Sequence, residues 1–191
     1  MLAGGKSNRM GEDKSLINWH GKEQRYHMAD MLEEFCDEVF ISCRDDEQQD
    51  GVDKGYNTLR DTFIGLGPMG GILSALREQP DAAWLVVACD LPLVDRTVIQ
   101  TLTDNRNTNA IATAFKSDYK DLPEPVITIY EPESYDILLQ FLSEGITCPR
   151  KVLINSNVHL LTNPGNDALA NANTPEEAER IRAIIKSNIN V

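Results

Sequence analysis

The sequence predicts an α/β protein in which a mainly parallel sheet carries helices on both faces. Short apolar runs alternate with amphipathic stretches along the whole chain, as they do in proteins built from β-α-β units. The run 84–88 (Trp-Leu-Val-Val-Ala) is continuous and apolar, which is typical of a central strand buried on both faces. Glycine pairs or clusters at 4–5 and 65–71 stand where strands would lead into loops or helices. At 191 residues, we expect one domain over 1–191.

The elements follow in order along the chain. We predict strands at 39–42, 57–60, 84–88, 110–115, 126–130 and 158–161. Helical spacing of apolar residues predicts helices over 22–35, 72–79, 134–143 and 149–154, one helix capped by Asp95, and a last helix opened by Thr174, Pro175 and Glu177 as a capping box. The segment that ends in Pro123-Glu124-Pro125 is interpreted as a charged loop. Only Met1, Leu2 and Ala3 precede the first glycines, so we expect a truncated first strand.

Composition and charge narrow the class of protein. A net charge of −12 disfavours non-specific binding to nucleic acid or to an anionic membrane, because both need a basic surface. The four cysteines form no Cys-x-x-Cys pair, so reduced thiols are favoured over a metal site or a redox motif. No leader-like or membrane-spanning apolar run is evident. We therefore expect a cytoplasmic protein without nucleic-acid or membrane partners.

The loop after Ala3 predicts a phosphate site. Gly4 and Gly5 allow a ligand to approach backbone N–H groups, and Arg9 and Lys14 add positive charge to an otherwise acidic chain. The spacing matches neither the P-loop nor the dinucleotide-binding pattern. A surface turn with solvated charges is the alternative, and composition alone does not decide between the two.

Two carboxylates follow predicted strands. Asp61 comes after 57–60, and Asp90 closely follows 84–88. Ligands of open α/β sheets bind beyond the carboxyl ends of the strands, so we expect these residues and the first loop to converge there. Mg²⁺ binds through one or two carboxylates together with substrate phosphates, which makes Asp90 the candidate metal ligand. A loop or helix-capping aspartate is the alternative for Asp90, and an exposed turn carboxylate is the alternative for Asp61.

The motif Leu-Ala-Gly-Gly-x-Ser-x-Arg-Met-Gly-x-Asp-Lys-x-Leu at 2–16 resembles the nucleotide-binding loop of the molybdenum cofactor guanylyltransferase family. Cys89-Asp90-Leu91-Pro92 is similar to the family's metal-binding segment. Gly67–Gly71 and Asn171–Glu177 also match its pattern, so the resemblance covers nearly the whole chain. It implies a three-layer α/β/α, Rossmann-like nucleotidyltransferase fold.

The resemblance also implies roles for single residues. Asp90 would bind Mg²⁺ and act in catalysis with Lys14 and Arg9. An asparagine is frequent in the family where this chain has Ser42, and that departure leaves one nucleotide contact open. The implied nucleotide-binding residues are Leu2, Ala3, Gly4, Gly5, Lys14, Ser42, Asp61 and Asp90. Candidate acceptor-binding residues are Arg150, Asn171 and Asn173, for which a solvated helix face or plain helix capping is the alternative.

The resemblance implies Mg²⁺-dependent transfer of GMP from GTP to the terminal phosphate of molybdopterin, with release of pyrophosphate. It also implies delivery or target-enzyme proteins of cofactor synthesis as further partners. Two alternatives stay open from the sequence. One is a nucleotidyltransferase that uses CTP, UTP or a sugar-phosphate acceptor, and the other is a nucleotide-binding module without catalysis.

Overall fold

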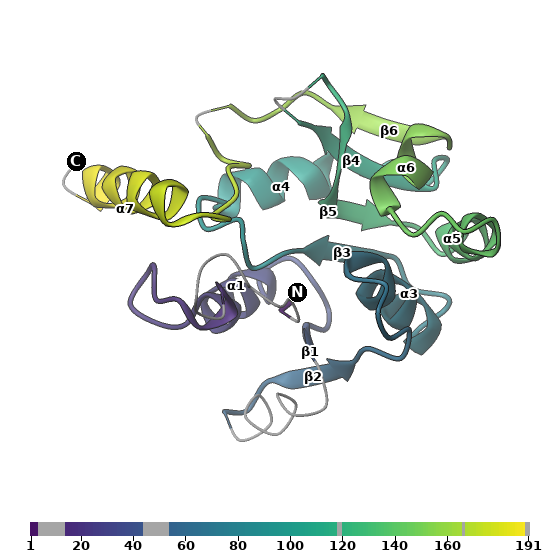
Figure 1. The fold of residues 1–191 in the computed structure, drawn as a ribbon, viewed down its shortest axis with the longest axis horizontal. Coiled ribbons are helices and arrows are strands. Elements are labelled where there is room, and N and C mark those ends of the chain that lie inside the picture. Colours follow the sequence, from purple (N-terminus) through teal and green to yellow (C-terminus); the bar gives the residue numbers. More distant parts are fainter. Residues whose placement is uncertain (4–13, 44–53, 118–119, 166, 190–191) are drawn as a thin grey trace.

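The computed structural model describes residues 1–3, 14–43, 54–117, 120–165 and 167–189 (Figure 1). Its strands are β1 (Phe40–Cys43), β2 (Asn57–Arg60), β3 (Trp84–Val87), β4 (Ala112–Lys116), β5 (Pro123–Tyr130) and β6 (Val158–Leu161). Its helices are the 3-10 turn η1 (Lys14–Leu16) and α1 (Gln24–Leu32), α3 (Pro68–Glu78), α4 (Arg96–Asp104), α5 (Ser134–Ser143), α6 (Pro149–Ile154) and α7 (Pro175–Ile189). Strands and helices alternate along much of the described chain, as the sequence predicts, although β5 follows β4 and α6 follows α5 directly.

Residues 1–3 join the strands into one continuous layer. β1 pairs with β2 in parallel, and β3, β5, β4 and β6 follow one another in a second group. Leu2 bridges in parallel to Ser42 on one side and to Ala88 on the other. Its N–H donates to the carbonyl of Val87 at 2.7 Å, and the N–H of Ala3 donates to the carbonyl of Ser42 at 3.1 Å. Residues 1–3 therefore lie between β1 and the end of β3 in the sheet, and the loop predicted after them begins at residue 4, outside the described residues.

β5 departs from the sequence prediction in direction and in length. It is antiparallel to both β3 and β4, whereas β4 and β6 are parallel. It also begins at Pro123, so the prediction of a loop at 123–125 is wrong. Pro123 pairs with Lys116 across a shift in register. A proline is tolerated at the first residue of a strand and at such irregularities, where no N–H is needed.

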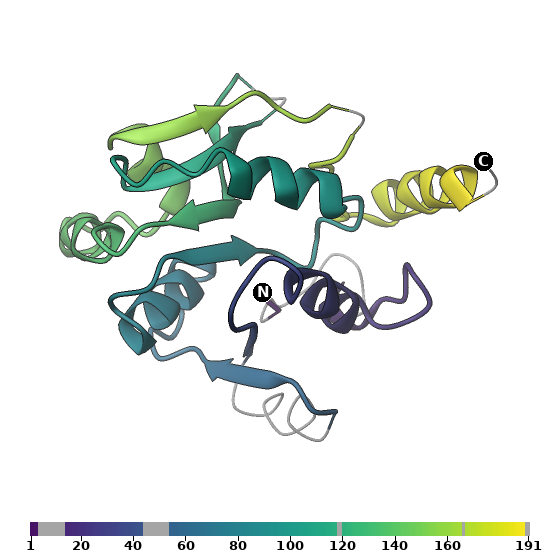
Figure 2. The same cartoon turned by 180° about the vertical axis from the view of Figure 1, so that it is seen from behind.

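Helices cover both faces of the sheet, which gives the predicted three layers. On one face α1 and α4 pack against inward side chains of the strands, among them Ile41, Val87 and Ile129. On the other face α3, α5 and α6 pack against the alternate positions, among them Val86, Ala112 and Tyr130. This alternation follows from the two-residue period of a strand, and the reverse view shows α4 across the upper strands (Figure 2).

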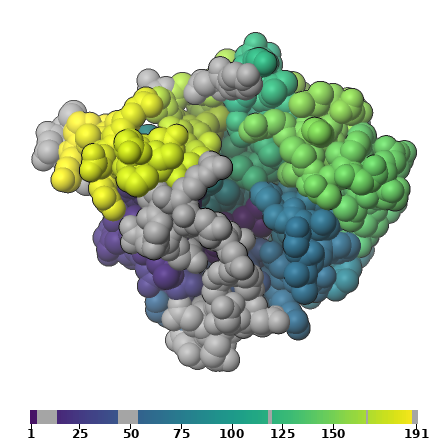
Figure 3. All heavy atoms as spheres, in the orientation of Figure 1, coloured from purple at the N-terminus to yellow at the C-terminus, as the bar shows by residue number. Residues whose placement is uncertain are grey.

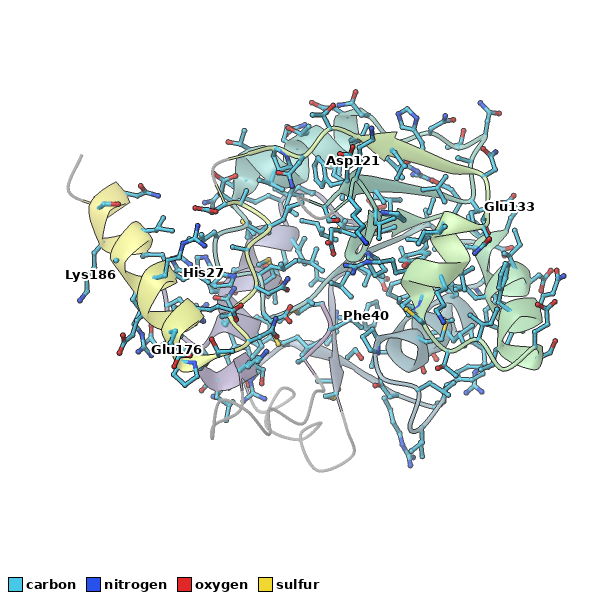
Figure 4. All side chains as sticks on the ribbon, turned by 45° about the horizontal axis from the view of Figure 1, so that its top comes forward. His27, Phe40, Asp121, Glu133, Glu176 and Lys186 are labelled. Carbon is cyan, nitrogen blue, oxygen red and sulfur yellow. The ribbon has the colours of Figure 1, made fainter. Side chains whose placement is uncertain are left out.

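The last helix, α7, lies beside the N-terminal part of the chain. Its residues Ala178, Ile181 and Ile185 form a small core with Ile17 and Trp19. Figure 4 shows Glu176 on α7 on the same side of the molecule as His27 on α1, and far from Glu133. The predicted capping box is confirmed because Glu177 accepts from the N–H of Thr174 at 3.0 Å and donates its own N–H to the Thr174 hydroxyl at 3.2 Å.

We expect Gly70→Ala to destabilise the fold. Gly70 lies in the first turn of α3, and an added Cβ would lie 2.3 Å from the backbone carbonyl oxygen of Phe63. Overpacking typically costs about 1–3 kcal/mol, and alanine in a helix returns less than about 1 kcal/mol, so we expect a net loss of about 1–2 kcal/mol. Urea unfolding measures it. Gly71→Ala is the control, because its nearest neighbour is the flexible end of Leu2, and an unchanged free energy of unfolding for Gly70→Ala would contradict the clash.

No helix among the described residues combines the length and the apolar character needed to cross a membrane.

Candidate functional site

A hollow of about 390 Å³ opens where the strands end at their carboxyl side. Residues from four neighbouring positions of the sheet reach it: Ala3, Ser42 from β1, Asp61 just after β2, and Asp90 just after β3. Figure 3 shows purple atoms of the N-terminal region deep between the blue surface of α3 and the green surface of the later elements. The two predicted carboxylates therefore share one cavity, as expected for a ligand site of an α/β sheet.

Asp90 is a partly buried carboxylate of this hollow. Its side chain is 25% exposed, and its Oδ2 lies 4.0 Å from the Nζ of Lys14. Its Oδ1 is buried and has no hydrogen-bond partner among the described residues. Burial raises the pKa of Asp90 above its ordinary value, although the nearby Lys14 acts in the opposite direction. A buried carboxylate oxygen without a donor fits a metal ligand, because a cation would satisfy it.

Lys14 links the two ends of the chain at this point. It is the first residue of η1, and its side chain is 16% exposed. The Nζ donates to the Oδ1 of Asn173 at 2.5 Å. The backbone N–H of Ala172 donates to the carbonyl of Asp90 at 2.9 Å. The segment before α7 is therefore held against both Lys14 and Asp90, although it lies more than 150 residues from Lys14 in the chain.

Ser42 and Asp61 form a pair on the opposite wall. The Ser42 hydroxyl donates to Oδ1 of Asp61 at 2.6 Å. Gly71 of α3 borders this pair, and a Cβ there would lie 3.1 Å from the Ser42 oxygen and 2.6 Å from Leu2. The second glycine cluster thus leaves the space that keeps this wall open. Gly67 and Pro68, which begin α3, line the same hollow.

Arg150 faces the hollow from α6. Its Nη2 donates to Glu124 at 2.7 Å and its Nε donates to the carbonyl of Pro123 at 3.1 Å. Glu124, Pro125 and Val126 line the hollow as well. None of these three residues was predicted for the site, because the segment ending at Pro125 was interpreted as a loop and Val126 only as the first residue of a strand. The run Pro-Glu-Pro directly before an apolar stretch is the signal that could have placed Glu124 at the start of a strand.

A second hollow of about 300 Å³ adjoins the first. Glu124 and Asn171 line both hollows. Asn173, Glu177 and Arg180 border only the second.

Most of the predicted site residues gather here. Arg9, Gly4 and Gly5 lie outside the described residues. Asn173 reaches the first hollow through its bond to Lys14. The predicted residues that line the first hollow directly are Leu2, Ala3, Lys14, Ser42, Asp61, Asp90, Arg150 and Asn171.

Residues 1–159 match the family model of the MobA-like NTP transferase domain. The chain belongs to this family. The Synechocystis molybdenum cofactor biosynthesis bifunctional protein is 33% identical over 181 residues, which are 95% of this chain and 52% of that protein. This MobA-like chain therefore spans about half the length of that relative. The molybdenum cofactor guanylyltransferase of Pseudomonas fluorescens is 28% identical over 92% of this chain and 88% of its own length.

A solved structure supports the same family. Molybdopterin-guanine dinucleotide biosynthesis protein A from Archaeoglobus fulgidus superposes with a TM-score of 0.79 at 26% identity, over 97% of both chains. This agreement confirms the predicted nucleotidyltransferase fold.

Membership of the family indicates that the site uses a metal ion. Nucleotidyltransferases of this kind use a divalent metal ion. Among the described residues, no three His, Cys, Asp or Glu side chains gather to enclose a metal ion, and the four cysteines form no disulfide bond with one another. A site built on the one carboxylate of Asp90 plus substrate phosphates is compatible with this arrangement.

Proposed function

We propose that this MobA-like domain transfers GMP from GTP to the terminal phosphate of molybdopterin and releases pyrophosphate. The observation that carries the proposal is the meeting of Asp90 and Lys14, 4.0 Å apart, in one hollow at the carboxyl ends of the strands. The names of the relatives support the choice of substrates. Residues 1–191 would act as one nucleotidyltransferase domain, because α7 packs on the segment that follows the first loop.

GTP would occupy the first hollow. Leu2 and Ala3 line it with their N–H groups already bonded within the sheet, and Ser42 and Asp61 offer a hydroxyl and a carboxylate on one wall. A carboxylate suits the N–H groups of a guanine base or the hydroxyls of a ribose. Gly4, Gly5 and Arg9 stay predictions for the phosphate-binding loop. Lys14 and Arg9 would neutralise the charge of the pyrophosphate that leaves.

Asp90 would hold the metal, and we propose Mg²⁺. Bound there, Mg²⁺ would withdraw charge from the α-phosphate of GTP. The chain itself would supply position and charge: an oxygen of the acceptor phosphate attacks the α-phosphorus, and the bond to pyrophosphate breaks. Because the phosphate is already a nucleophile, no covalent intermediate with the protein is required, and orientation is the main contribution of the residues around it.

The acceptor phosphate would bind at the border of the two hollows. Asn171 lines both hollows, and Arg150 lines the first and is bonded to Glu124, which lines both. Asn173 borders the second hollow and contacts Lys14. A guanidinium binds phosphate through two parallel hydrogen bonds, which favours Arg150 as the ligand of the acceptor phosphate.

Pyrophosphate release tests the proposal. The purified chain is supplied with Mg²⁺, molybdopterin and each of GTP, ATP, CTP and UTP, with and without a delivery protein of cofactor synthesis. We expect release with GTP and only in the presence of molybdopterin. A preference for CTP or UTP, or for a sugar-phosphate acceptor, would show that the enzyme uses other substrates than GTP and molybdopterin. Tight GTP binding without any release would instead support a non-catalytic nucleotide-binding module.

A further inference from the structure

The pair Arg150–Glu124 stands where the two hollows meet. Glu124 lines both of them, and Arg150 lines the first. Under the proposed function, the α-phosphate of GTP and the acceptor phosphate must meet near this border. The residue that fixes the Arg150 side chain would therefore fix the acceptor phosphate.

Two hydrogen bonds determine the position of the guanidinium. Nε donates to the carbonyl oxygen of Pro123 and Nη2 donates to Oε2 of Glu124, at 3.1 and 2.7 Å. Nη1 takes part in neither bond. Both acceptors belong to consecutive residues of β5, so the plane of the guanidinium is tied to the strand.

The side chains of Glu124 and Arg150 differ in how far they are buried. The Glu124 side chain is 13% exposed, whereas that of Arg150 is 38% exposed. The carboxylate is thus the buried support, and the guanidinium is the accessible group. An arginine already held in one orientation loses less conformational entropy when it binds a ligand.

The backbone around Glu124 is unusually restricted. Pro123 and Pro125 fix φ on either side, and a residue that precedes proline is limited to extended conformations. The carbonyl of Glu124 also accepts from the hydroxyl of Thr128 at 2.5 Å. The support for Arg150 is therefore a stiff start of a strand and not an adaptable loop, which is the construction that a precise binding site requires.

The charges nearby favour a phosphate at the border over one deep in the second hollow. That hollow is lined by the carboxylates of Glu124, Asp167 and Glu177. Its arginine, Arg180, is paired with Asp167 at 2.6 Å. An anion would be repelled from these carboxylates and attracted to the accessible guanidinium of Arg150.

We propose that Glu124 is a positioning residue that holds the Arg150 guanidinium at the border of the two hollows and so sets where the acceptor phosphate binds. The inference rests on the proposed function. Glu124 would not touch the reacting atoms, and its effect would pass through Arg150.

Glu124→Gln tests this, because glutamine keeps the size of the side chain and removes its charge. We expect the KM for molybdopterin to rise about tenfold, with a smaller change in kcat and an unchanged KM for GTP. The Kd for molybdopterin, measured by calorimetry without GTP, should rise by the same factor. In an Arg150→Gln background, Glu124→Gln should have no further effect on either quantity.

Glu131→Gln is the matched control. Glu131 follows β5 and is buried, and it pairs with Arg106 at 2.7 Å through two parallel bonds. It lines neither hollow. Glu131→Gln should lower the free energy of unfolding and leave the KM for molybdopterin unchanged.

The outcomes separate the two proposals. An unchanged or lowered Kd for molybdopterin in Glu124→Gln would overturn the positioning role, as would full additivity with Arg150→Gln. If the wild-type chain binds molybdopterin but releases no pyrophosphate, the proposed function fails while the Kd values still decide the role of Glu124. A wild-type chain that does not bind molybdopterin at all would overturn both.

Discussion

Asp90→Asn is expected to reduce pyrophosphate release by about a thousandfold. The side chain combines a buried oxygen that has no donor among the described residues with a lysine 4.0 Å from its other oxygen. Asparagine keeps the shape and removes the charge that a cation needs. Loss of one preorganised electrostatic contact in an active site typically costs about 10²–10³ in rate, and the loss of a metal site reaches the upper end.

The same substitution should make the metal-free protein more stable at neutral pH. Burial raises the pKa of Asp90 in the folded state above the ordinary value of 3.8. The folded chain therefore binds the proton more tightly than the unfolded chain, and stability is lost as the pH rises through the raised pKa. Asp90→Asn removes this loss. Urea unfolding of both proteins at pH 7 and pH 4, with a chelator, should show an advantage of the variant that shrinks at the lower pH.

Asp95→Ala is the control for Asp90→Asn. It should lower the free energy of unfolding and leave pyrophosphate release unchanged. The Asp95 side chain caps α4 by accepting from the N–H of Val98 at 3.0 Å. Loss of such a cap costs about 1 kcal/mol of stability, while pyrophosphate release should be retained. An Asp90→Asn variant with wild-type release would refute the assignment of Asp90 as the metal ligand.

Lys14→Met is expected to lower kcat/KM for GTP by about 10²–10³, the usual cost of removing a group that stabilises developing charge. The methylene stem is kept, so packing changes little. Lys14 also lowers the pKa of Asp90. Its removal should raise that pKa further, and the acidic limb of the pH profile of pyrophosphate release should move to higher pH, because the ionised carboxylate is the form that binds a cation. Steady-state kinetics from pH 5 to pH 8 measure both effects.

Lys54→Met is the matched control for Lys14→Met. Lys54 pairs with Glu23 at 2.9 Å, and its side chain is 42% exposed. It lines neither hollow. We expect wild-type kinetics. A Lys14→Met profile that loses activity without a shift on the acidic side would contradict the coupling between Lys14 and Asp90.

Local patterns in the sequence predicted much of the fold. The apolar run of β3, the cap at Asp95 and the capping box at Thr174 depend on neighbours within a few residues, and all three are confirmed. The start of β5 was missed because Pro123 and Pro125 have no N–H to donate to a neighbouring strand, and prolines therefore indicate a loop. Its direction was missed as well, because the choice between parallel and antiparallel pairing depends on contacts with β3 and β4.

The residues of the candidate site also differ in whether a local sequence pattern points to them. Asp61 and Asp90 are candidates from the sequence because each follows a predicted strand, and Lys14 is one because it is a cation in the loop that begins with paired glycines. Glu124 was not found because nothing in its local pattern points to Arg150, which lies 26 residues away in the chain.

The sequence alone determined the fold class, the family and the carboxylates at the strand ends, because alternating apolar segments and short motifs are local properties of the chain. Only the tertiary structure decided that Lys14 meets Asn173 and Asp90, that Glu124 supports Arg150, and that two hollows share a border. Each of these contacts joins side chains from separate elements, and their distances depend on how the sheet is ordered and how the helices pack on it.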